Sequence, residues 1–233
     1  MYPAKVSEEW HSHEQAHVTF MLRGGNRERR TKTEQQLGAG QLVFYHSREL
    51  HRNDHTLFPS RNLNLEIEPI FFQTYHLTEH QVDQAVKTGR LTGLEVTRLF
   101  YEALHPDPSA ADSLHLLLLG YLQKTKGPGR PVGLLRAREW LHDNWYTWPT
   151  LAELAAVAGL HPVTLSKYFP QYFGYSLSQY MRRLKVQQAL PLVSASRYSL
   201  SEIAYRCGFA DQSHFIRCFK EQTGMPPSSF KRF

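Results

Sequence analysis

Two stretches in the last third of the chain, 150–174 and 199–224, repeat one pattern of polar and apolar positions. In each, a hydroxyl residue precedes a glutamate by three positions, which is the capping box that opens a helix. Apolar residues follow at helical spacing and end at a glycine, as is typical of a helix C-terminus. These residues are Thr150, Glu153 and Gly159 in the first stretch, and Ser199, Glu202 and Gly208 in the second.

A second helix is predicted directly after each glycine. In the first stretch it begins at His161, with Pro162 in the first helical position, and in the second it begins with Asp211 as N-cap. The two helices run to Gly174 and Gly224. A helix, a tight glycine turn and another helix form the helix-turn-helix pattern, whose second helix enters the major groove of DNA.

Helical periodicity divides each second helix into an inner and an outer face. The inner faces are expected to hold Leu165, Tyr168, Phe169, Phe215, Cys218 and Phe219. The outer faces, which include Ile216, carry cations for guanine or phosphate, polar groups for base edges, and aliphatic groups for thymine methyls. The candidate DNA-binding residues are Val163, Thr164, Ser166, Lys167, Gln212, Ser213, His214 and Arg217.

A connecting helix is predicted between the repeats, from Ser176 to Val193, opened by Ser176 with Gln179. Its roughly eighteen residues span about 27 Å, the scale that sets two recognition helices in major-groove turns about 34 Å apart. Pro191 lies inside it, where proline costs about 3 kcal/mol. The prediction leaves open whether the helix kinks or ends there. A lead helix is predicted from Val132 to Trp145.

The segment from Val132 to Phe233 resembles the double helix-turn-helix domain of the AraC/XylS family of bacterial transcription regulators. LSEIAYRCGFADQSHFIRCFKEQTGMPPSSFKR, starting at Leu200, and RRLKVQQA, starting at Arg182, carry the resemblance. It implies binding to double-stranded promoter or operator DNA, a homodimer, contact with RNA polymerase, and a small-molecule effector that acts through the N-terminal part.

The charge is divided unevenly along the chain. Residues 1–131 hold 15 Lys and Arg against 15 Asp and Glu, whereas residues 132–233 hold 12 against 6. The whole net charge of +6 therefore belongs to the C-terminal part. A basic segment that carries groove-entering helices is the electrostatic pattern of a phosphate-binding module.

The N-terminal part shows alternating and β-branched runs separated by glycine, asparagine and proline, which predicts short antiparallel strands in a small barrel or sandwich. The predicted fold class is α+β multidomain, with a small antiparallel β-barrel, following helices and then an all-α domain. The predicted strands are His17–Leu22, Gln41–Tyr45, Asn62–Ile67 and Ile70–Tyr75.

The same region resembles the cupin barrel. His11 and His13 match the paired histidines of the first cupin motif, His17 stands in place of its glutamate, and Gly24 closes it. Gly40 and His51 keep the spacing of the second motif. The sequence departs from the pattern because no glycine opens the first motif, and because the proline, glycine and asparagine of the second are replaced by His46, Arg48 and His55.

The histidines allow two interpretations. Imidazoles two positions apart on a strand face the same side, so His11, His13, His17 and His51 would form a four-nitrogen site for a divalent transition metal such as zinc, nickel, copper or iron. In the other interpretation they line an organic effector pocket or fill a polar barrel interior. Both interpretations stay open at this point, and no other cofactor is predicted.

Residues 77–125 are predicted to be helical. Leucines recur in 91–104, and Ser109 with Asp112 caps a further leucine-rich segment that packs on the barrel, on a second subunit, or on both. Lys124–Pro131 has the composition of a linker. The predicted domains are 1–76 (sensor barrel), 77–125 (helical pair for dimerisation), 126–131 (linker) and 132–233 (DNA-binding domain).

Several classes of protein are excluded or disfavoured. The chain lacks an apolar run near 18 residues and a signal-peptide pattern, so no membrane partner is expected. Cys207 and Cys218 fall on predicted inner faces, as expected for buried thiols in a reducing cytoplasm. A ligand-responsive transcription regulator is favoured over a cupin-type metal-dependent enzyme with a DNA-binding tail, because His17 leaves that enzyme no carboxylate base. A constitutive DNA-binding protein is the third alternative.

Overall fold

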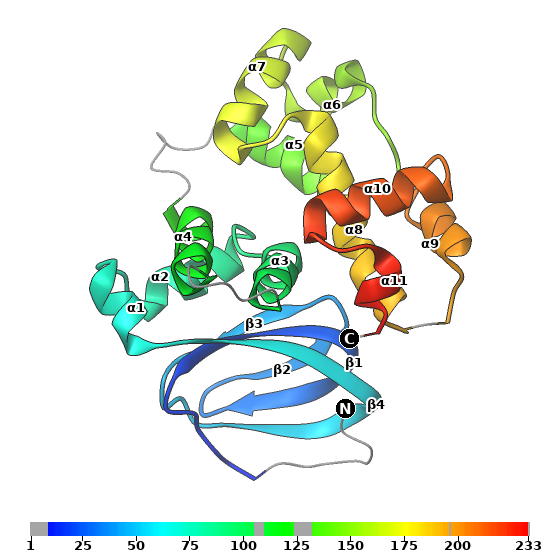
Figure 1. Cartoon of the computed structure of the whole chain (residues 1–233). Coiled ribbons are helices and arrows are strands. Elements are labelled where there is room, and N and C mark those ends of the chain that lie inside the picture. Colours follow the sequence, from blue (N-terminus) through cyan, green and yellow to red (C-terminus); the bar gives the residue numbers. More distant parts are fainter. Residues whose placement is uncertain (1–8, 105–109, 124–131, 196, 233) are drawn as a thin grey trace.

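The computed structural model of the chain describes residues 9–104, 110–123, 132–195 and 197–232. Antiparallel strands come first and helices follow (Figure 1). The strands are β1 (Ala16–Arg30), β2 (Glu34–Gly38), β3 (Leu42–Tyr45) and β4 (His51–Ile67). The predicted order, a sheet followed by a helical C-terminal part, is confirmed.

The sheet is open. β1 is its central strand, and β4 pairs along one edge of it, from Ala16 opposite Ile67 to Arg30 opposite His51. β3 and then β2 pair along the other edge. The prediction of a closed barrel is wrong, since small barrels close with about five to eight strands and the described residues supply four.

Two local features explain why the strand boundaries were mispredicted. β1 continues through Gly24, where Cβ would lie 2.3 Å from the Leu57 carbonyl oxygen and φ is +79°, so only glycine lets β1 and β4 approach here. Register shifts between Met21 and Arg27 absorb the irregularity. The predicted strand 70–75 is wrong, because Pro69 takes the first position of a helix instead.

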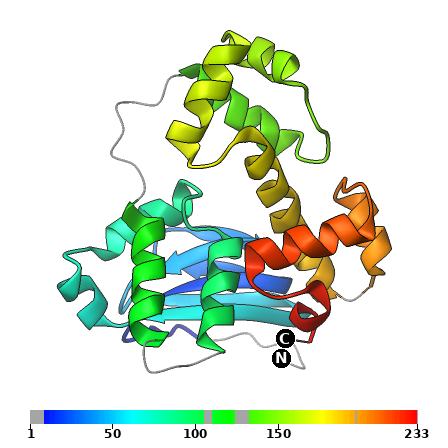
Figure 2. The same ribbon diagram turned by 45° about the horizontal axis from the view of Figure 1, so that its top comes forward.

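Four helices follow the sheet and lie over one of its faces (Figures 1 and 2). The predicted helix 91–104 is confirmed as α3, which opens with a capping box of Thr92 and Glu95. The predicted cap at Ser109 lies outside the described residues, as does the predicted linker 126–131. The helices are α1 (Pro69–Thr74), α2 (Glu79–Lys87), α3 (Gly93–Ala103) and α4 (Ala110–Gln123).

The C-terminal part consists of two helical units joined by one long helix, α8. The first unit holds α5 to α7 and the second holds α9 to α11 (Figure 1). The bounds are α5 (Val132–Asp143), α6 (Leu151–Ala158), α7 (Pro162–Phe173), α8 (Leu177–Ala195), α9 (Leu200–Arg206), α10 (Gln212–Thr223) and α11 (Pro227–Phe230).

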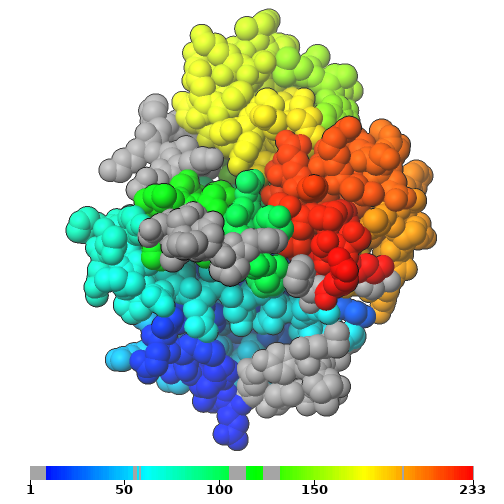
Figure 3. Space-filling view, in the orientation of Figure 1, coloured from blue at the N-terminus to red at the C-terminus, as the bar shows by residue number. Residues whose placement is uncertain are grey.

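The buried apolar side chains form two large cores. The first unit has its own core, which includes Leu141, Phe169 and Met181. The second unit shares a core with the sheet and α3, in which Phe20 of β1 and Phe219 of α10 both take part. In the space-filling view the second unit, orange and red, lies directly against the green surface of α3 (Figure 3). The second unit is therefore packed onto the N-terminal part.

Candidate DNA-binding face and histidine cluster

The predicted helix starts of both helix-turn-helix units are confirmed. Thr150 Oγ1 accepts from the Glu153 amide at 3.2 Å, and Ser199 Oγ accepts from the Glu202 amide at 3.2 Å. In turn, each glutamate carboxylate accepts from the backbone N–H of the N-cap residue, Thr150 at 2.7 Å and Ser199 at 2.8 Å. The turns between the helices contain Gly159 and Gly208 in the left-handed region, with φ values of 65° and 67°.

α7 begins at His161, whose Nδ1 accepts from the Val163 amide at 3.3 Å. Its predicted inner residues Leu165 and Phe169 are fully buried, while Tyr168 is 39% exposed, so its placement on the inner face was wrong. Tyr168 instead lies beside the Lys167 ammonium, 5.5 Å from the ring centroid. The candidate readers Val163, Ser166 and Lys167 are exposed and Thr164 is half-buried.

α10 begins at Asp211, whose carboxylate accepts from the His214 amide at 2.7 Å. Gln212, Ser213 and Arg217 are exposed, and His214 is half-buried against Phe209. Ile216 was expected to face outward but packs partly against the shared core. The C-terminal end of α10 meets α3, since a Cβ at Gly224 would lie 2.5 Å from the Tyr101 ring. The packing on α3 therefore leaves the N-terminal end of α10 exposed.

The rings of the four predicted ligand histidines gather in one cluster. The backbone of His11 pairs with that of His51, with both N–H to carbonyl distances at 3.0 Å. Nitrogens of His11, His13 and His51 all lie within 4.8 Å of one another. His17 is near them, with its ring 4.6 Å from that of His13, but it stacks on Tyr45 at 4.6 Å and 12° and is not one of this group.

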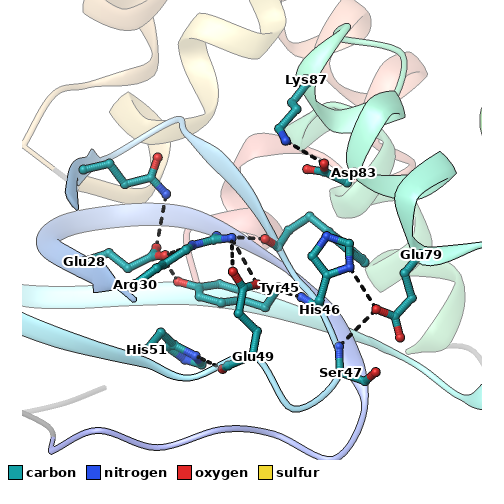
Figure 4. Close-up of polar contacts among 12 residues, drawn as sticks. Glu28, Arg30, Tyr45, His46, Ser47, Glu49, His51, Glu79, Asp83 and Lys87 are labelled. Atoms are coloured by element: carbon teal, nitrogen blue, oxygen red, sulfur yellow. Dashed lines mark hydrogen bonds and ion pairs between the residues drawn. The ribbon is translucent and has the colours of Figure 1, made fainter. Parts of the chain in front are cut away.

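Hydrogen bonds fix which nitrogen of each ring carries the proton. Because a carbonyl oxygen can only accept, His11 Nδ1 donates to the Glu9 carbonyl at 2.9 Å. His51 Nδ1 likewise donates to the Glu49 carbonyl at 2.9 Å (Figure 4). In the neutral form of either ring, Nε2 is then the nitrogen that carries the lone pair. Burial, followed by the charge of neighbouring imidazoles, lowers the pKa of His51, so its neutral, metal-ligating form dominates at pH 7. Burial lowers the pKa of His17 to about 4.

A buried ion network lies behind the histidines (Figure 4). Glu28 is fully buried and accepts from the Tyr45 hydroxyl at 2.7 Å and from Arg30 Nε. Arg30 also donates to Glu49 at 2.9 Å and to the Phe44 carbonyl at 2.8 Å. Burial, then the Glu28 carboxylate, raises the pKa of Tyr45, so its hydroxyl stays a donor. The network holds Tyr45 against His17 and Glu49 against His51.

Comparisons with known proteins bear on the C-terminal part. Residues 154–232 match the family model described as a helix-turn-helix domain. The chain is 31% identical over 91 residues to the uncharacterized HTH-type transcriptional regulator YpdC of Escherichia coli strain K12, covering 39% of this chain and 32% of that protein. It is 29% identical over 136 residues to the HTH-type transcriptional activator RhaS of Escherichia coli O139:H28, covering 54% and 47%. The C-terminal part of the chain is therefore similar to the helix-turn-helix domains of transcription regulators.

The chain spans less than half the length of these two curated relatives. Both relatives are named as transcription regulators and not as enzymes. Among solved structures, the chain is similar to the DNA-binding domain of AdpA, a global transcriptional factor, in complex with a target DNA. That match has 27% identity, covers 43% of this chain and 90% of that one, and has a TM-score of 0.40.

In the C-terminal part α8 continues through Pro191 to Ala195, so the helix does not end early. Buried residues of α8 reach both cores. Lys185, 2% exposed, donates from Nζ to the Gly208 carbonyl at 2.7 Å and lies 5.0 Å from the Trp148 ring centroid. The connecting helix therefore holds the turn of the second unit against the residues that precede α6.

Sequence reasoning missed the ion pair that joins the N-terminal part to this domain. Arg183 of α8 pairs with Glu95 of α3, with side-chain exposures of 17% and 4%. Arg183 also donates to Gln222 at 2.9 Å and stacks on Tyr175 at 4.4 Å. The capping box of α3 indicates from the local sequence that Glu95 lies at a helix start. No local pattern could indicate its pairing with Arg183, which lies 88 positions away.

Proposed function

We propose that the chain is a sequence-specific DNA-binding transcription regulator in which α7 and α10 read the major groove. The observation that carries this proposal is the pair of capped helix-turn-helix units, each with polar side chains exposed at the start of its second helix. The excess of basic over acidic residues in 132–233 adds phosphate attraction. The names of the relatives agree with this function.

The candidate readers differ in chemistry. Lys167 and Arg217 are exposed cations for guanine or phosphate, whereas Gln212, Ser213 and Ser166 offer hydrogen bonds to base edges. Thr164, Val163 and His214 complete the proposed set. α8, 19 residues long and so about 28 Å from end to end, joins the two recognition helices.

Selection of genomic fragments by the purified protein, followed by titration of the selected duplex, tests the proposal. Arg217→Ala should weaken binding by about 1–3 kcal/mol and relax the preference at one base pair if Arg217 reads a guanine. Lys32→Ala, which removes an exposed cation from the β1–β2 turn, is the control and should leave binding unchanged. Retention of random and selected duplexes with equal affinity would refute sequence-specific reading.

We propose further that the N-terminal part senses a divalent transition metal at His11, His13 and His51. The lone-pair Nε2 atoms and the carbonyl bonds at Nδ1 support this, because ligating imidazoles usually donate their other N–H to such a group. Nitrogens about 2.1 Å from a tetrahedral metal lie about 3.4 Å apart, so the three nitrogens, which now lie within 4.8 Å of one another, would move closer together on binding. His17 would not bind the metal itself; it would support the position of the Tyr45 ring, which lies 4.5 Å from the ring of His51.

Titration of the metal-free protein with zinc, nickel and copper, with elemental analysis of the purified protein, tests this site. His13→Ala should abolish stoichiometric metal, because two histidines bind too weakly to compete with buffer. His80→Ala, at an exposed histidine of α2, is the matched control. If the protein binds no metal while small organic molecules raise its Tm in a His13-dependent way, the histidines instead line an organic effector pocket.

We propose a homodimer that uses α4. The supporting observation is its apolar composition together with Leu116, which is 62% exposed. Leu116→Asp should shift the protein from dimer to monomer in light scattering coupled to gel filtration, with Leu57→Asp, at a 59% exposed position of β4, as control. A wild-type protein that is monomeric at micromolar concentration would refute the dimer.

A further inference from the structure

A cavity of about 660 Å³ lies at the seam between the N-terminal helices and the first helix-turn-helix unit. One wall comes from 87–95, where α2 ends and α3 begins, together with Tyr121 of α4. The other wall comes from α5, the end of α7 and the start of α8. Ligand cavities in proteins measure about 300–1,000 Å³, so this one has the size for a small organic molecule.

Two arginines meet in this cavity from opposite walls. Arg90 donates from Nε to Thr88 Oγ1 at 3.1 Å and from Nη1 to the Leu122 carbonyl at 3.2 Å. Arg138 of α5 donates from Nη1 to the Thr88 carbonyl at 3.5 Å, and its guanidinium carbon lies 5.9 Å from the Phe173 ring centroid. Both guanidiniums therefore contact Thr88. Arg90 reaches it from the N-terminal part, and Arg138 reaches it from the DNA-binding domain.

Within the described part of the chain, neither Arg90 nor Arg138 has a carboxylate partner. Arg138 Nε is also buried without a hydrogen-bond partner among the described residues. Half-buried cations are costly unless an anion compensates them, and a carboxylate suits the forked donors of a guanidinium. The ion pairs formed by other cavity-lining residues are Lys87–Asp83 and Arg183–Glu95.

The remaining titratable groups of the α5 wall do not cancel this positive charge. Glu139 and Asp143 are exposed, so water screens their carboxylates. His142 is exposed as well, and its Nε2 lies 2.9 Å from the Tyr180 hydroxyl. The half-buried part of the cavity therefore favours an anion.

Aromatic side chains line the rest of the cavity and offer apolar faces to a ligand body. Burial raises the pKa of Tyr121, so its hydroxyl remains protonated and does not oppose an anion. An aromatic lining suits a planar or aliphatic group attached to the carboxylate. The aromatic residues are Tyr121, Tyr172, Phe173, Tyr175 and Tyr180.

We propose that this cavity binds a small organic carboxylate, whose carboxylate bridges Arg90 and Arg138 while its apolar body lies among the tyrosines. Such a ligand fastens the first helix-turn-helix unit to the N-terminal part, which already holds the second unit through the shared core. The position of α7 relative to α10 then depends on the ligand. The proposal that a ligand binds is argued from the cavity alone, whereas an effect of the ligand on DNA affinity rests on the proposed function.

Calorimetric titration of the full chain with benzoate and octanoate, without DNA, tests the site. At least one of them should bind and raise the Tm, and benzamide, which lacks the charge, should not. Arg90→Gln and Arg138→Gln should each weaken the carboxylate by about 10- to 100-fold, the usual cost of losing a hydrogen bond to a charged group. Arg136→Gln, an exposed arginine on the same helix as Arg138, should leave binding unchanged.

Arg90→Lys and Arg138→Lys separate a lost ligand contact from misfolding, because they keep the positive charge and remove the forked donors of the guanidinium. Affinities between those of the wild type and the glutamine variants support the carboxylate bridge. Binding of benzamide as tight as that of benzoate, affinity unaffected by both glutamine substitutions, or no binding at millimolar concentration would each overturn the proposal. Inorganic phosphate binding as tightly as benzoate would overturn the role of the tyrosines. These outcomes are independent of whether the protein selects DNA.

Discussion

Removal of Arg183 should loosen the joint between the N-terminal part and the C-terminal helical units. Glu95 is 4% exposed, and one of its carboxylate oxygens pairs with Arg183 while the other accepts from the Thr92 amide at 2.9 Å. Breaking a buried ion pair from one side costs about 3–5 kcal/mol. The carboxylate keeps its hydrogen bonds from Thr92 after Arg183 is removed, so the cost should be somewhat smaller. Arg183→Ala should therefore lower the free energy of unfolding by about 2–4 kcal/mol.

Urea denaturation of four proteins, the wild type, Arg183→Ala, Glu95→Gln and the double variant, gives the coupling energy of the pair. Arg182→Ala is the control, because Arg182 neighbours Arg183 on α8 and has no ion pair among the described residues, and its effect should stay within about 0.5 kcal/mol. A cost below about 1 kcal/mol for Arg183→Ala would refute the reasoning, since that is the value of a solvent-exposed pair.

Three further outcomes follow from single contacts. Gly93→Ala should destabilise the fold by about 1–3 kcal/mol, because its Cβ would lie 2.3 Å from the buried Phe20 ring; Gly120→Ala, with nothing within 4 Å, should not, and urea denaturation compares them. Asp211→Ala removes the cap on the His214 amide and should cost about 1 kcal/mol in the same assay, with no loss indicating that water replaces the cap. Burial raises the pKa of Cys207 to about 12, so its thiol stays protonated at neutral pH and should not react with a disulfide reagent until denaturant is added; fast reaction of the native protein would contradict its burial.

The C-terminal helices were predictable because their signals are local. Thr150 with Glu153 and Ser199 with Glu202 specify helix starts within four residues of sequence, and the glycine turns that follow need no distant partner. The N-terminal sheet was less predictable, because a strand is stabilised by residues far away in the sequence. β2 is mostly exposed and polar, so its sequence shows no alternation, and only its pairing with β1 makes it a strand.

The candidate sites divide in the same way. Spacing along the chain was enough to select His11, His13 and His51, but not to show that His17 stacks on Tyr45. Nothing near Arg90 in the sequence indicates Arg138, because the cavity between them exists only once the two parts of the chain pack together. Residues that meet at an interface between two parts of a chain are brought together by tertiary structure, so no periodic pattern in the sequence indicates them.

The membership of α8 in both large cores bears on how this chain can be recombined with others. Leu184 packs in the core of the first unit, whereas Val186, Leu190 and Val193 pack in the core shared with the sheet. A hybrid that grafts 132–233 onto a foreign N-terminal domain would leave part of this second set uncovered unless the donor supplies a matching apolar face. Hybrids that keep the native strands and α3 should stay soluble, and those that exchange them should aggregate.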